Sequence, residues 1–334
     1  MKISRRTLIA AGAGALAGDV LIRLAVPSGA RAEGRRLRIA SVKFGTLAWL
    51  LETIKAEKLD AKHDLVLQIV ETATNQSSPI ALYGGSADVV VTDWPWALRQ
   101  RAMGEAVRFA PFSGALGAVV VPEDSPIRTL ADLKGKRLGV AGSSTDKSWL
   151  LLRAHARAVL GSDLADLVTP QYGAAPLLAE QLKDGRLDAV LNFWTFTARL
   201  EAQGFRRVIS MSEVMTALGI DPQPALVGFI WKEGSEPELL PAIDSLLAAA
   251  REANQLLLTS DAPWERLRPM MKAADDSEFK ALIAGYRSGV RGYWSEADMK
   301  SAEKIMQILL SGGDEELVGR GTRFDPRAFH APGA

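Results

Sequence analysis

The sequence contains no cysteine and only three histidines, His63, His155 and His330, which lie far apart along the chain. Disulfides therefore cannot hold the fold, and no cysteine is present to carry a lipid anchor. Three scattered histidines without a thiolate also argue against a His/Cys metal site. We expect neither a metal nor a cofactor.

The sequence also lacks any uncharged apolar run of about 20 residues, the length that a membrane-spanning helix needs. Of the 334 residues, 48% are hydrophobic and 24% are charged, with 40 basic and 39 acidic side chains. This composition is that of a soluble globular protein with room for about two α/β lobes. Its balanced charge gives no sign of nucleic acid or of an anionic membrane surface as a partner.

The first 32 residues have the pattern of an export signal. Residues 4–9 read SRRTLI, a twin-arginine motif, and an Ala/Gly-rich stretch follows, interrupted by Asp19. Residues 30–32 then offer an A-x-A cleavage site. The pattern predicts removal of residues 1–32, a periplasmic mature protein and a net charge that changes from +1 to a negative value. An amphipathic helix is the alternative reading.

Segments with strand patterns alternate with segments of helical spacing, which indicates an α/β fold with parallel strands. The expected strands are residues 37–42, 65–70, 88–92, 118–121, 137–141, 167–172, 187–191 and 225–231. The expected helices are residues 47–58, 75–83, 130–133, 148–159, 177–183, 237–258, 263–273, 277–286 and 295–310.

Two parts of the chain repeat each other at an offset of 100 residues. Gly85–Trp94 reads GSADVVVTDW and Gly185–Trp194 reads GRLDAVLNFW, and Trp49 on the first helix has its counterpart in Trp149. Matching positions inside the same strand–helix order indicate two lobes built on one plan. Chance similarity within generic α/β patterning remains the alternative.

The strands near Ala118–Val121 and Ala225–Trp231 flank the second α/β unit, so the chain enters and leaves that unit through them. Two such connections form a hinge between lobes. We expect a signal peptide at residues 1–32, a first lobe at 33–121 and 225–311, a second lobe at 122–224, and an irregular tail packed on the surface at 312–334.

Ligands of parallel α/β sheets bind beyond the carboxyl ends of the strands, and the residues that follow the strands here are rich in aromatic, hydroxyl and amide side chains. Free N–H groups where helices begin, at Gly45–Leu47 and Ser144–Lys147, favour an anionic group. The predicted ligand-binding residues are Lys43, Phe44, Thr46, Asp93, Trp94, Trp96, Ser113, Ser143, Ser144, Thr145, Asn192, Trp194 and Phe229.

Each of these residues also has a structural interpretation. Lys43 is equally consistent with a solvated turn lysine. For Trp94, Trp96 and Trp194 the alternative is core packing under a loop. Asp93 precedes Pro95 and can cap the helix that starts there. Asp88 and Asp188 resemble paired acids, but each more simply ties the glycine turn before its strand.

Catalytic motifs are weak. Gly142–Ser148 resembles a phosphate-binding loop, but Asp146 stands where the motif requires glycine. Ser144–Lys147 fits S-x-x-K without the downstream motifs of penicillin-recognising enzymes. No catalytic residue is predicted. The only titratable candidates for an enzyme are Lys43, Asp93, Asp146 and Tyr172.

Three segments are informative together: SPIRTLADLKGKRLGV (Ser125–Val140), GRLDAVLNFW (Gly185–Trp194) and GGSADVVVTDW (Gly84–Trp94). They resemble segments of the periplasmic substrate-binding proteins of ABC importers of the nitrate/sulfonate/taurine type, a class that also includes thiamine-pyrimidine binders. The resemblance extends over residues 36–310. It implies a type II fold of two α/β lobes, two hinge strands and a helical C-terminal segment. One solute is then bound between lobes that close on it.

The resemblance implies delivery of the solute to an ABC permease by a monomer that neither inserts into the membrane nor binds nucleic acid. The candidate loops lack a run of arginines and are rich in tryptophan, so we expect a small organic ligand with one anionic group and a flat or apolar body. An enzyme on the same scaffold, of lyase or pyrimidine-synthesis type, is the alternative function. A receptor that presents its ligand to a sensor kinase is a third.

Overall fold

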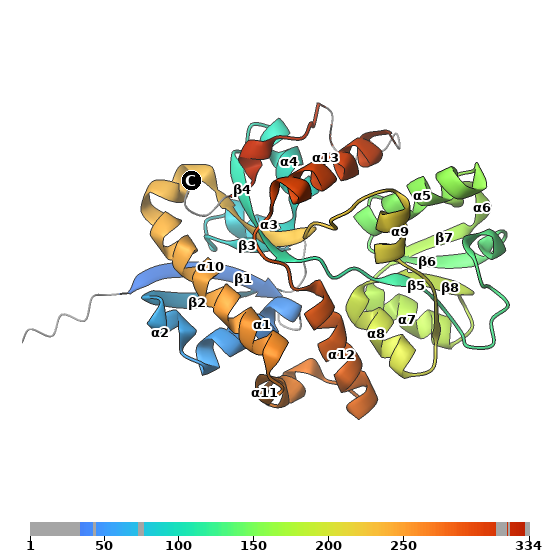
Figure 1. Cartoon of the computed structure of the whole chain (residues 1–334), viewed down its shortest axis with the longest axis horizontal. Helices are drawn as coiled ribbons and strands as arrows, with labels where there is room; N and C mark the ends of the chain where they lie inside the picture. Colours follow the sequence, from blue (N-terminus) through green and yellow to red (C-terminus); the bar gives the residue numbers. More distant parts are fainter. Residues whose placement is uncertain (1–33, 43–44, 73–76, 312–318, 320, 331–334) are drawn as a thin grey trace, which may run out of the picture. The chain divides into compact units, whose positions relative to one another are not determined.

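In the computed structural model (Figure 1), the residues described are 34–42, 45–72, 77–311, 319 and 321–330. They lie in a single unit that spans Gly34–Ala334. The predicted signal peptide falls outside the described residues. Within the described part of the chain, no helix is both long enough and apolar enough to cross a membrane.

The chain alternates strands with helices and then continues almost entirely in helices. It opens with β1 (Arg35–Val42), α1 (Thr46–Ala56), α2 (Leu59–Lys62), β2 (Leu65–Thr72), α3 (Ser77–Tyr83), β3 (Val90–Asp93), α4 (Trp94–Ala102) and β4 (Val107–Ser113). It continues with β5 (Ala118–Val121), η1 (Leu130–Leu133), β6 (Arg137–Ala141), α5 (Lys147–Leu160), α6 (Leu164–Leu167), β7 (Thr169–Gly173), α7 (Ala175–Lys183), β8 (Ala189–Asn192), α8 (Trp194–Ala202), β9 (Arg206–Ser210) and α9 (Met211–Ala217). It ends with β10 (Val227–Lys232), η2 (Glu233–Ser235), α10 (Glu236–Thr259), α11 (Ala262–Met271), α12 (Asp276–Gly289), α13 (Glu296–Ser311) and η3 (Pro326–Ala328).

The strands form two sheets of the same order. In the second lobe the order is β7-β6-β8-β5-β9, in which β6 pairs in parallel with β7 and β8, and β5 runs antiparallel to its neighbours. In the first lobe β1 pairs in parallel with β2, and β10 lies antiparallel between β3 and β4. A parallel bridge between Ile39 and Val89 joins the two groups, giving β2-β1-β3-β10-β4. The repeat predicted from the sequence is therefore a repeat of topology, and the α/β two-lobe fold is confirmed.

Equivalent Arg–Asp pairs hold the starts of the strands. The Asp88 carboxylate accepts hydrogen bonds from the backbone N–H of Arg38, at 2.8 Å, and from its guanidinium, which also donates to the Gly85 carbonyl. Asp188 accepts the same bonds from Arg137, whose guanidinium donates to the Gly185 carbonyl. The aspartates were predicted to tie the glycine turns before their strands, and each does so through an arginine on the neighbouring strand.

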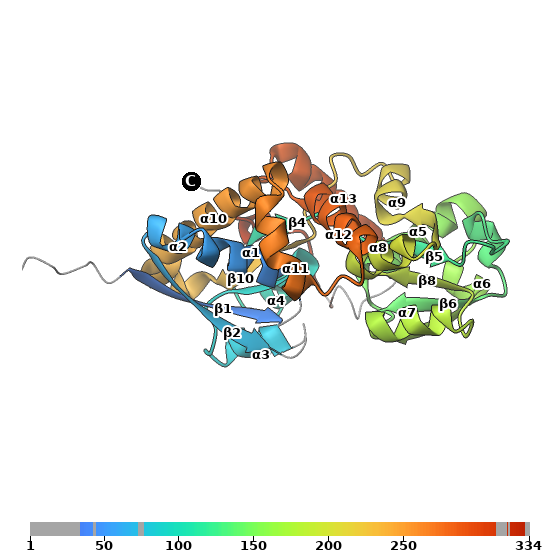
Figure 2. The same cartoon turned by 90° about the horizontal axis from the view of Figure 1, so that it is seen from below.

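The side chains on the two faces of each sheet belong to different apolar clusters, because side chains alternate along a strand. Leu138 and Val140 of β6 pack with residues of α5, whereas the neighbouring Ala141 packs with residues of α7. Figure 1 shows α5 and α7 on opposite sides of this sheet. In the first lobe, α1, α10, α11 and α12 share a cluster with Leu37 and Ile39 of β1, and α10 runs along the sheet in both views (Figures 1 and 2).

The chain connects the lobes through the segments that follow β4 and α9. At the first connection Gly117 approaches β8 so closely that a Cβ atom there would lie 1.6 Å from the Asn192 carbonyl oxygen. The segment between α12 and α13 runs beside this connection, since the N–H of Gly114 donates to the Gly289 carbonyl at 2.8 Å and Ser113 bridges Val290. A glycine is therefore required where the chain enters the second lobe.

Several features differ from the sequence-based expectations. β4 was not predicted as a strand, because Pro111 interrupts its pattern; proline is tolerated there since β4 is an edge strand. β9, α8 and α9 were also not predicted. The tail was expected on the surface, yet Ala328 and Phe329 are buried and Phe329 stacks on Trp294 at 4.5 Å. The lobe boundaries drawn from the sequence remain a prediction.

Candidate functional site

An ion pair joins the two lobes at the carboxyl ends of their strands. Lys147, the first residue of α5, places its Nζ 3.5 Å from Oδ2 of Asp93, the last residue of β3. Asp146 adjoins Lys147 and caps α5, accepting bonds from the N–H groups of Ser148, at 2.9 Å, and Trp149, at 3.4 Å. We call Asp93, Asp146 and Lys147 the interlobe cluster.

Burial and charge act against each other in this cluster. Burial lowers the pKa of Lys147, but the carboxylates of Asp93 and Asp146 raise it by more, so the net direction is upward. Burial raises the pKa of Asp146, and this outweighs the stabilisation of its carboxylate by Lys147 and by the two N–H groups. Lys147 therefore stays a cation at neutral pH, held between two acids that only partly face solvent.

The helix starts offer anion sites of unequal quality. The N–H groups expected to be free at the start of α5 are largely used: Thr145 N–H donates to the Ser143 hydroxyl at 3.3 Å, and Asp146 N–H to the Ser143 carbonyl at 3.0 Å. The N-cap of α1 is Gly45, which has no side chain to occupy the first N–H groups of that helix. Thr46, half-buried, is the first residue of α1. The first N–H groups are therefore less occupied by the chain's own acceptors at α1 than at α5.

Trp194 lies where α8 of the second lobe meets the first lobe. Its ring packs so closely on α12 that a Cβ atom on Gly285 would lie 2.7 Å from it, and it meets the Trp49 ring edge-on at 6.1 Å. One turn later on α8, Arg199 pairs with Glu278 of α12 and donates to the Met271 carbonyl at 2.7 Å. Burial lowers the pKa of Arg199. Trp194 thus belongs to a packed contact between lobes, and it is partly exposed.

The remaining candidates lie near the surface or outside the described residues. Ser143 and Ser144 are exposed, and the Ser143 and Thr145 hydroxyls lie 2.9 Å apart. The half-buried Ser113 accepts a bond from the Ala115 N–H at 3.2 Å. Lys43 and Phe44 lie outside the described residues. Trp96 is half-buried and packs on Tyr83, with ring centroids 6.1 Å apart.

Three predicted site residues are buried in the core instead. Trp94 is 0% exposed and sits edge-on to Trp294 at 6.2 Å, while Phe229 is 2% exposed and packs on Phe112 at 5.5 Å. Asn192 is 2% exposed, donating to the Ala175 carbonyl and accepting from the Phe193 N–H. The structure favours packing roles for these three side chains, and we leave them out of the proposed site.

Asp93 combines the two interpretations that the sequence left open. Its carboxylate caps α4 by accepting from the Trp96 N–H at 3.0 Å, and its other oxygen faces Lys147. Lys147 itself was not among the predicted binding residues. The signal was present in the sequence, since Lys147 opens the helix after β6, but its partner on the other lobe, 54 positions earlier in the chain, could only be found in the structure.

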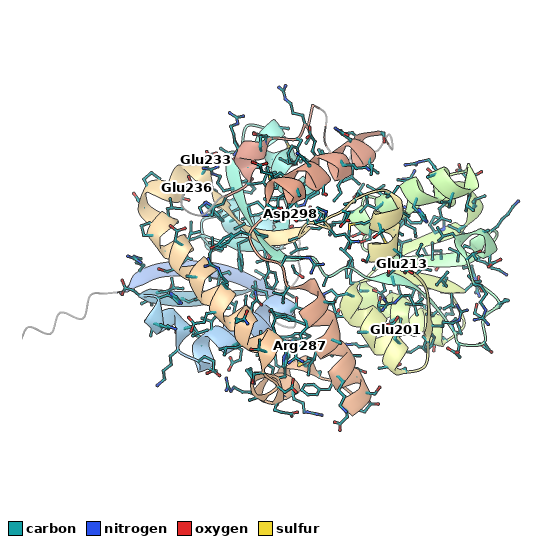
Figure 3. The ribbon with its side chains drawn as sticks, in the orientation of Figure 1. Glu201, Glu213, Glu233, Glu236, Arg287 and Asp298 are labelled. Carbon is teal, nitrogen blue, oxygen red and sulfur yellow. The ribbon has the colours of Figure 1, made fainter. Side chains whose placement is uncertain are left out.

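Two cavities lie away from the interlobe cluster. The larger, about 770 Å³, lies at the start of α10, beside Glu233 and Glu236, which Figure 3 labels. Glu233 pairs with Arg101 at 2.8 Å, and Glu236 pairs with Arg108 at 3.2 Å. The smaller, about 260 Å³, lies between α10 and the segment that follows α12. The interlobe cluster is defined by its charges and its place at the strand ends, not by a cavity of this kind.

The comparisons with known proteins agree with this architecture. Residues 61–217 match the NMT1/THI5 like family. A putative thiamine biosynthesis protein from Haemophilus influenzae is 30% identical over 144 residues, which are 42% of this chain and 46% of that protein. The chain thus spans about half the length of this curated relative.

Solved structures show the fold over nearly the whole chain. The alkanesulfonate-binding protein SsuA from Xanthomonas axonopodis pv. citri, bound to MOPS, superposes with a TM-score of 0.69 at 18% identity, covering 90% of this chain and 99% of that one. The desulfurization enzyme DSZB superposes with a TM-score of 0.57 at 20% identity, covering 84% and 92%. The resemblance read from the sequence is confirmed: the chain has the fold of the periplasmic substrate-binding proteins of ABC importers, and its residues 61–217 match the NMT1/THI5 like family.

Proposed function

We propose that this protein is a periplasmic solute receptor that binds a small organic molecule between its lobes and delivers it to an ABC permease. The observation that carries the proposal is the pairing of Asp93 with Lys147 across two sheets of identical strand order. A ligand in that position contacts both lobes at once. The fold shared with an alkanesulfonate-binding protein supports the same reading.

In this proposal the first lobe comprises residues 33–121 and 225–311, and the second comprises residues 122–224. The connections after β4 and α9 act as the hinge. A ligand shifts the lobes toward closure only if it makes contacts in the closed state that it lacks in the open state. Lys147 and Asp93 meet that requirement, because each lies on a different lobe and the ligand's polar groups bridge them.

The ligand carries one anionic group and a body that is partly flat or apolar. Lys147 attracts the anionic group, and the first turn of α1, whose N-cap offers no side chain, completes its site. Asp93 and Asp146 offset part of the charge of Lys147, so they disfavour a ligand with more than one negative charge and favour hydrogen-bond donors on the rest of its body. The edge of Trp194 and the face of Trp96 supply apolar contact.

Native mass spectrometry of the freshly purified mature protein tests the proposal by weighing any solute that it retains. The identified solute is then expected to raise the melting temperature of the wild type. Lys147→Met removes this rise, whereas Lys134→Met, a change at an exposed lysine outside the cluster, leaves it unchanged. An equal rise in the Lys147→Met variant refutes this placement of the ligand.

A catalytic function on the same scaffold is the second candidate. The desulfurization enzyme DSZB has the same fold, and Asp146 is a carboxyl group whose pKa burial raises, as suits a proton-transferring residue. Tyr172 is 42% exposed on β7 and packs on Trp149, so it is a weaker candidate. Incubation of the retained solute with the protein, followed by mass spectrometry, separates the functions, since a receptor releases the solute unchanged.

We further propose that the protein acts as a monomer, that the twin-arginine pathway exports it, and that its partners are the transmembrane subunits of the permease. The charge pattern of residues 1–32 supports the export route. Replacement of Arg5 and Arg6 by lysine is expected to keep the precursor in the cytoplasm. Cell fractionation measures this outcome, and normal periplasmic accumulation of the variant argues for another pathway.

A further inference from the structure

The cavity of about 260 Å³ beside the hinge has the character of an anion site. It lies between α10, strands β4 and β10, and the segment after α12, on residues that the proposed function does not use. Two of its lining residues are arginines, Arg251 and Arg291, and none is acidic. A cavity bordered by two guanidinium groups without a carboxylate has a positive potential that a small anion neutralises.

Neither arginine is neutralised within the described part of the chain. Arg251 is exposed at the cavity and lies over the Tyr293 ring, 4.4 Å from its centroid, and makes no ion pair with any residue described. Arg291 donates from Nη1 to the carbonyls of Ser288, at 2.6 Å, and Val290, at 3.0 Å. These are neutral acceptors, so both positive charges remain available to a ligand.

A buried amide adds a further donor. Asn254 is 9% exposed and lines the cavity, and its Oδ1 accepts a hydrogen bond from the Tyr286 hydroxyl at 2.8 Å. Burial raises the pKa of Tyr286, so this hydroxyl stays protonated and keeps the amide oxygen occupied. Among the bonds of the described residues, the amide nitrogen Nδ2 has no acceptor. The Nδ2 group is therefore available to donate to an anion in the cavity.

The other walls are apolar. Phe229, Leu247, Leu258 and Val290 line the same cavity. Because these walls cannot hydrogen-bond to water, they disfavour a fully hydrated inorganic ion and favour an anion with a short hydrocarbon part. From this combination we infer that the cavity binds a small organic monoanion, a carboxylate with a short alkyl chain, between Arg251, Arg291 and Asn254.

Such a ligand lies against the hinge. The Arg291 guanidinium packs on the backbone of the first connection, where a Cβ atom on Gly114 would lie 3.0 Å from Nε. Nε also faces the carbonyl of Gln223, on the second connection, at 3.5 Å. An anion on Arg291 therefore sits next to both connections, which gives the site a means to influence lobe movement without entering the cleft.

Isothermal titration calorimetry of the mature protein with butyrate tests the inference, with uncharged butyramide as the matched probe. Butyrate is expected to bind and butyramide to bind at least ten-fold more weakly. Arg251→Gln weakens butyrate binding about ten-fold or more, since it removes a charged donor. Arg251 is exposed, so this variant folds, and Arg266→Gln, at an exposed arginine of α11, serves as the control without effect.

Two results of the titrations overturn the inference. The first is butyrate binding that Arg251→Gln leaves unchanged, and the second is binding that Lys147→Met abolishes, because it places butyrate in the cleft. The position is tested directly by crystals grown with 3-bromopropionate. An anomalous bromine peak in the cavity beside Arg251 supports the site, whereas a peak only at the interlobe cluster refutes it.

Discussion

The two lobes share one plan but treat equivalent residues differently. β3 ends in Asp93 and α4 begins at Trp94, while β8 ends in Asn192, Phe193 follows as N-cap and α8 begins at Trp194. Trp94 points into the core and is 0% exposed, whereas Trp194 lies against α12 of the other lobe and is partly exposed. The repeat places both tryptophans at equivalent backbone positions, but the neighbouring elements determine whether each side chain is buried or exposed.

The cap residues show the same divergence. Asp93 caps α4 and faces Lys147, but its counterpart Phe193 makes no side-chain cap. In the second lobe Asp146 caps α5, and the counterpart of that helix start in the first lobe has Gly45. The acids of the interlobe cluster thus come from non-equivalent strands, and the site is asymmetric although the scaffold is not.

The largest expected effect on stability comes from replacing Trp94 with alanine, compared with the same change at Trp194. Trp94→Ala is expected to lower the free energy of unfolding by about 4 kcal/mol, because it leaves a large cavity among Trp294, Phe324 and Phe329. Trp194→Ala is expected to cost less than half of that but to abolish the ligand-induced rise in melting temperature. Urea unfolding monitored by circular dichroism measures both variants. Equal losses of stability mean that the two rings do not differ as the structure shows.

The contact between lobes at α8 gives the second prediction. Glu278 is 3% exposed and pairs with Arg199, so Arg199→Met leaves a buried carboxylate without its partner and is expected to cost about 3 kcal/mol. The double variant Arg199→Met/Glu278→Leu recovers most of this loss, since both charges are gone. Urea unfolding again provides the measurement, and a double variant as unstable as the single one contradicts the explanation.

Much of the scaffold could be predicted from the sequence. The strand at 137–141 appears as β6 with the same bounds, and the long helices predicted at 237–258 and 295–310 appear as α10 and α13 within one residue at each end. Their periodicity is strong because one face of each element is buried. β4 was missed because Pro111 and the mixed burial of an edge strand weaken the pattern.

The site could be predicted only as a region. The sequence indicates which residues follow strands, but burial of Trp94, Asn192 and Phe229 depends on elements far along the chain, such as α7 and the tail that supplies Phe329. The local sequence does not determine which side chains at the start of a helix will be buried by distant elements. The pairing of Lys147 with Asp93 has the same origin, because it depends on how two separately folded sheets meet.

The interlobe cluster gives a prediction of intermediate size. Lys147→Met is expected to remove the ligand-induced rise in melting temperature and to change the free energy of unfolding of the ligand-free protein by only about 1 kcal/mol, because the pair with Asp93 at 3.5 Å is partly solvated. Asp93→Asn tests the other lobe. It keeps a side-chain oxygen for the α4 cap but loses the charge that faces Lys147, so it is expected to weaken ligand binding less than Lys147→Met does. A titration of the retained solute by calorimetry ranks the two variants, and the reverse order refutes the assignment of the anionic group to Lys147.

The smallest expected difference lies in the strand-anchoring pairs. Asp88→Asn is expected to cost about 1 kcal/mol and Asp188→Asn about half as much, since the Asp88 side chain is 13% exposed and the Asp188 side chain 31%. Hydrogen bonds from Arg137 lower the pKa of Asp188, so its carboxylate stabilises the folded protein at pH values above the unfolded value of about 3.9. That contribution disappears as the pH falls through the lower folded value. The gap between wild type and Asp188→Asn in urea unfolding is therefore full at pH 7 and shrinks below about pH 4. If the gap stays constant down to pH 2, the loss of stability comes from the hydrogen-bond geometry of asparagine and not from the missing charge. That result contradicts an electrostatic role for Asp188.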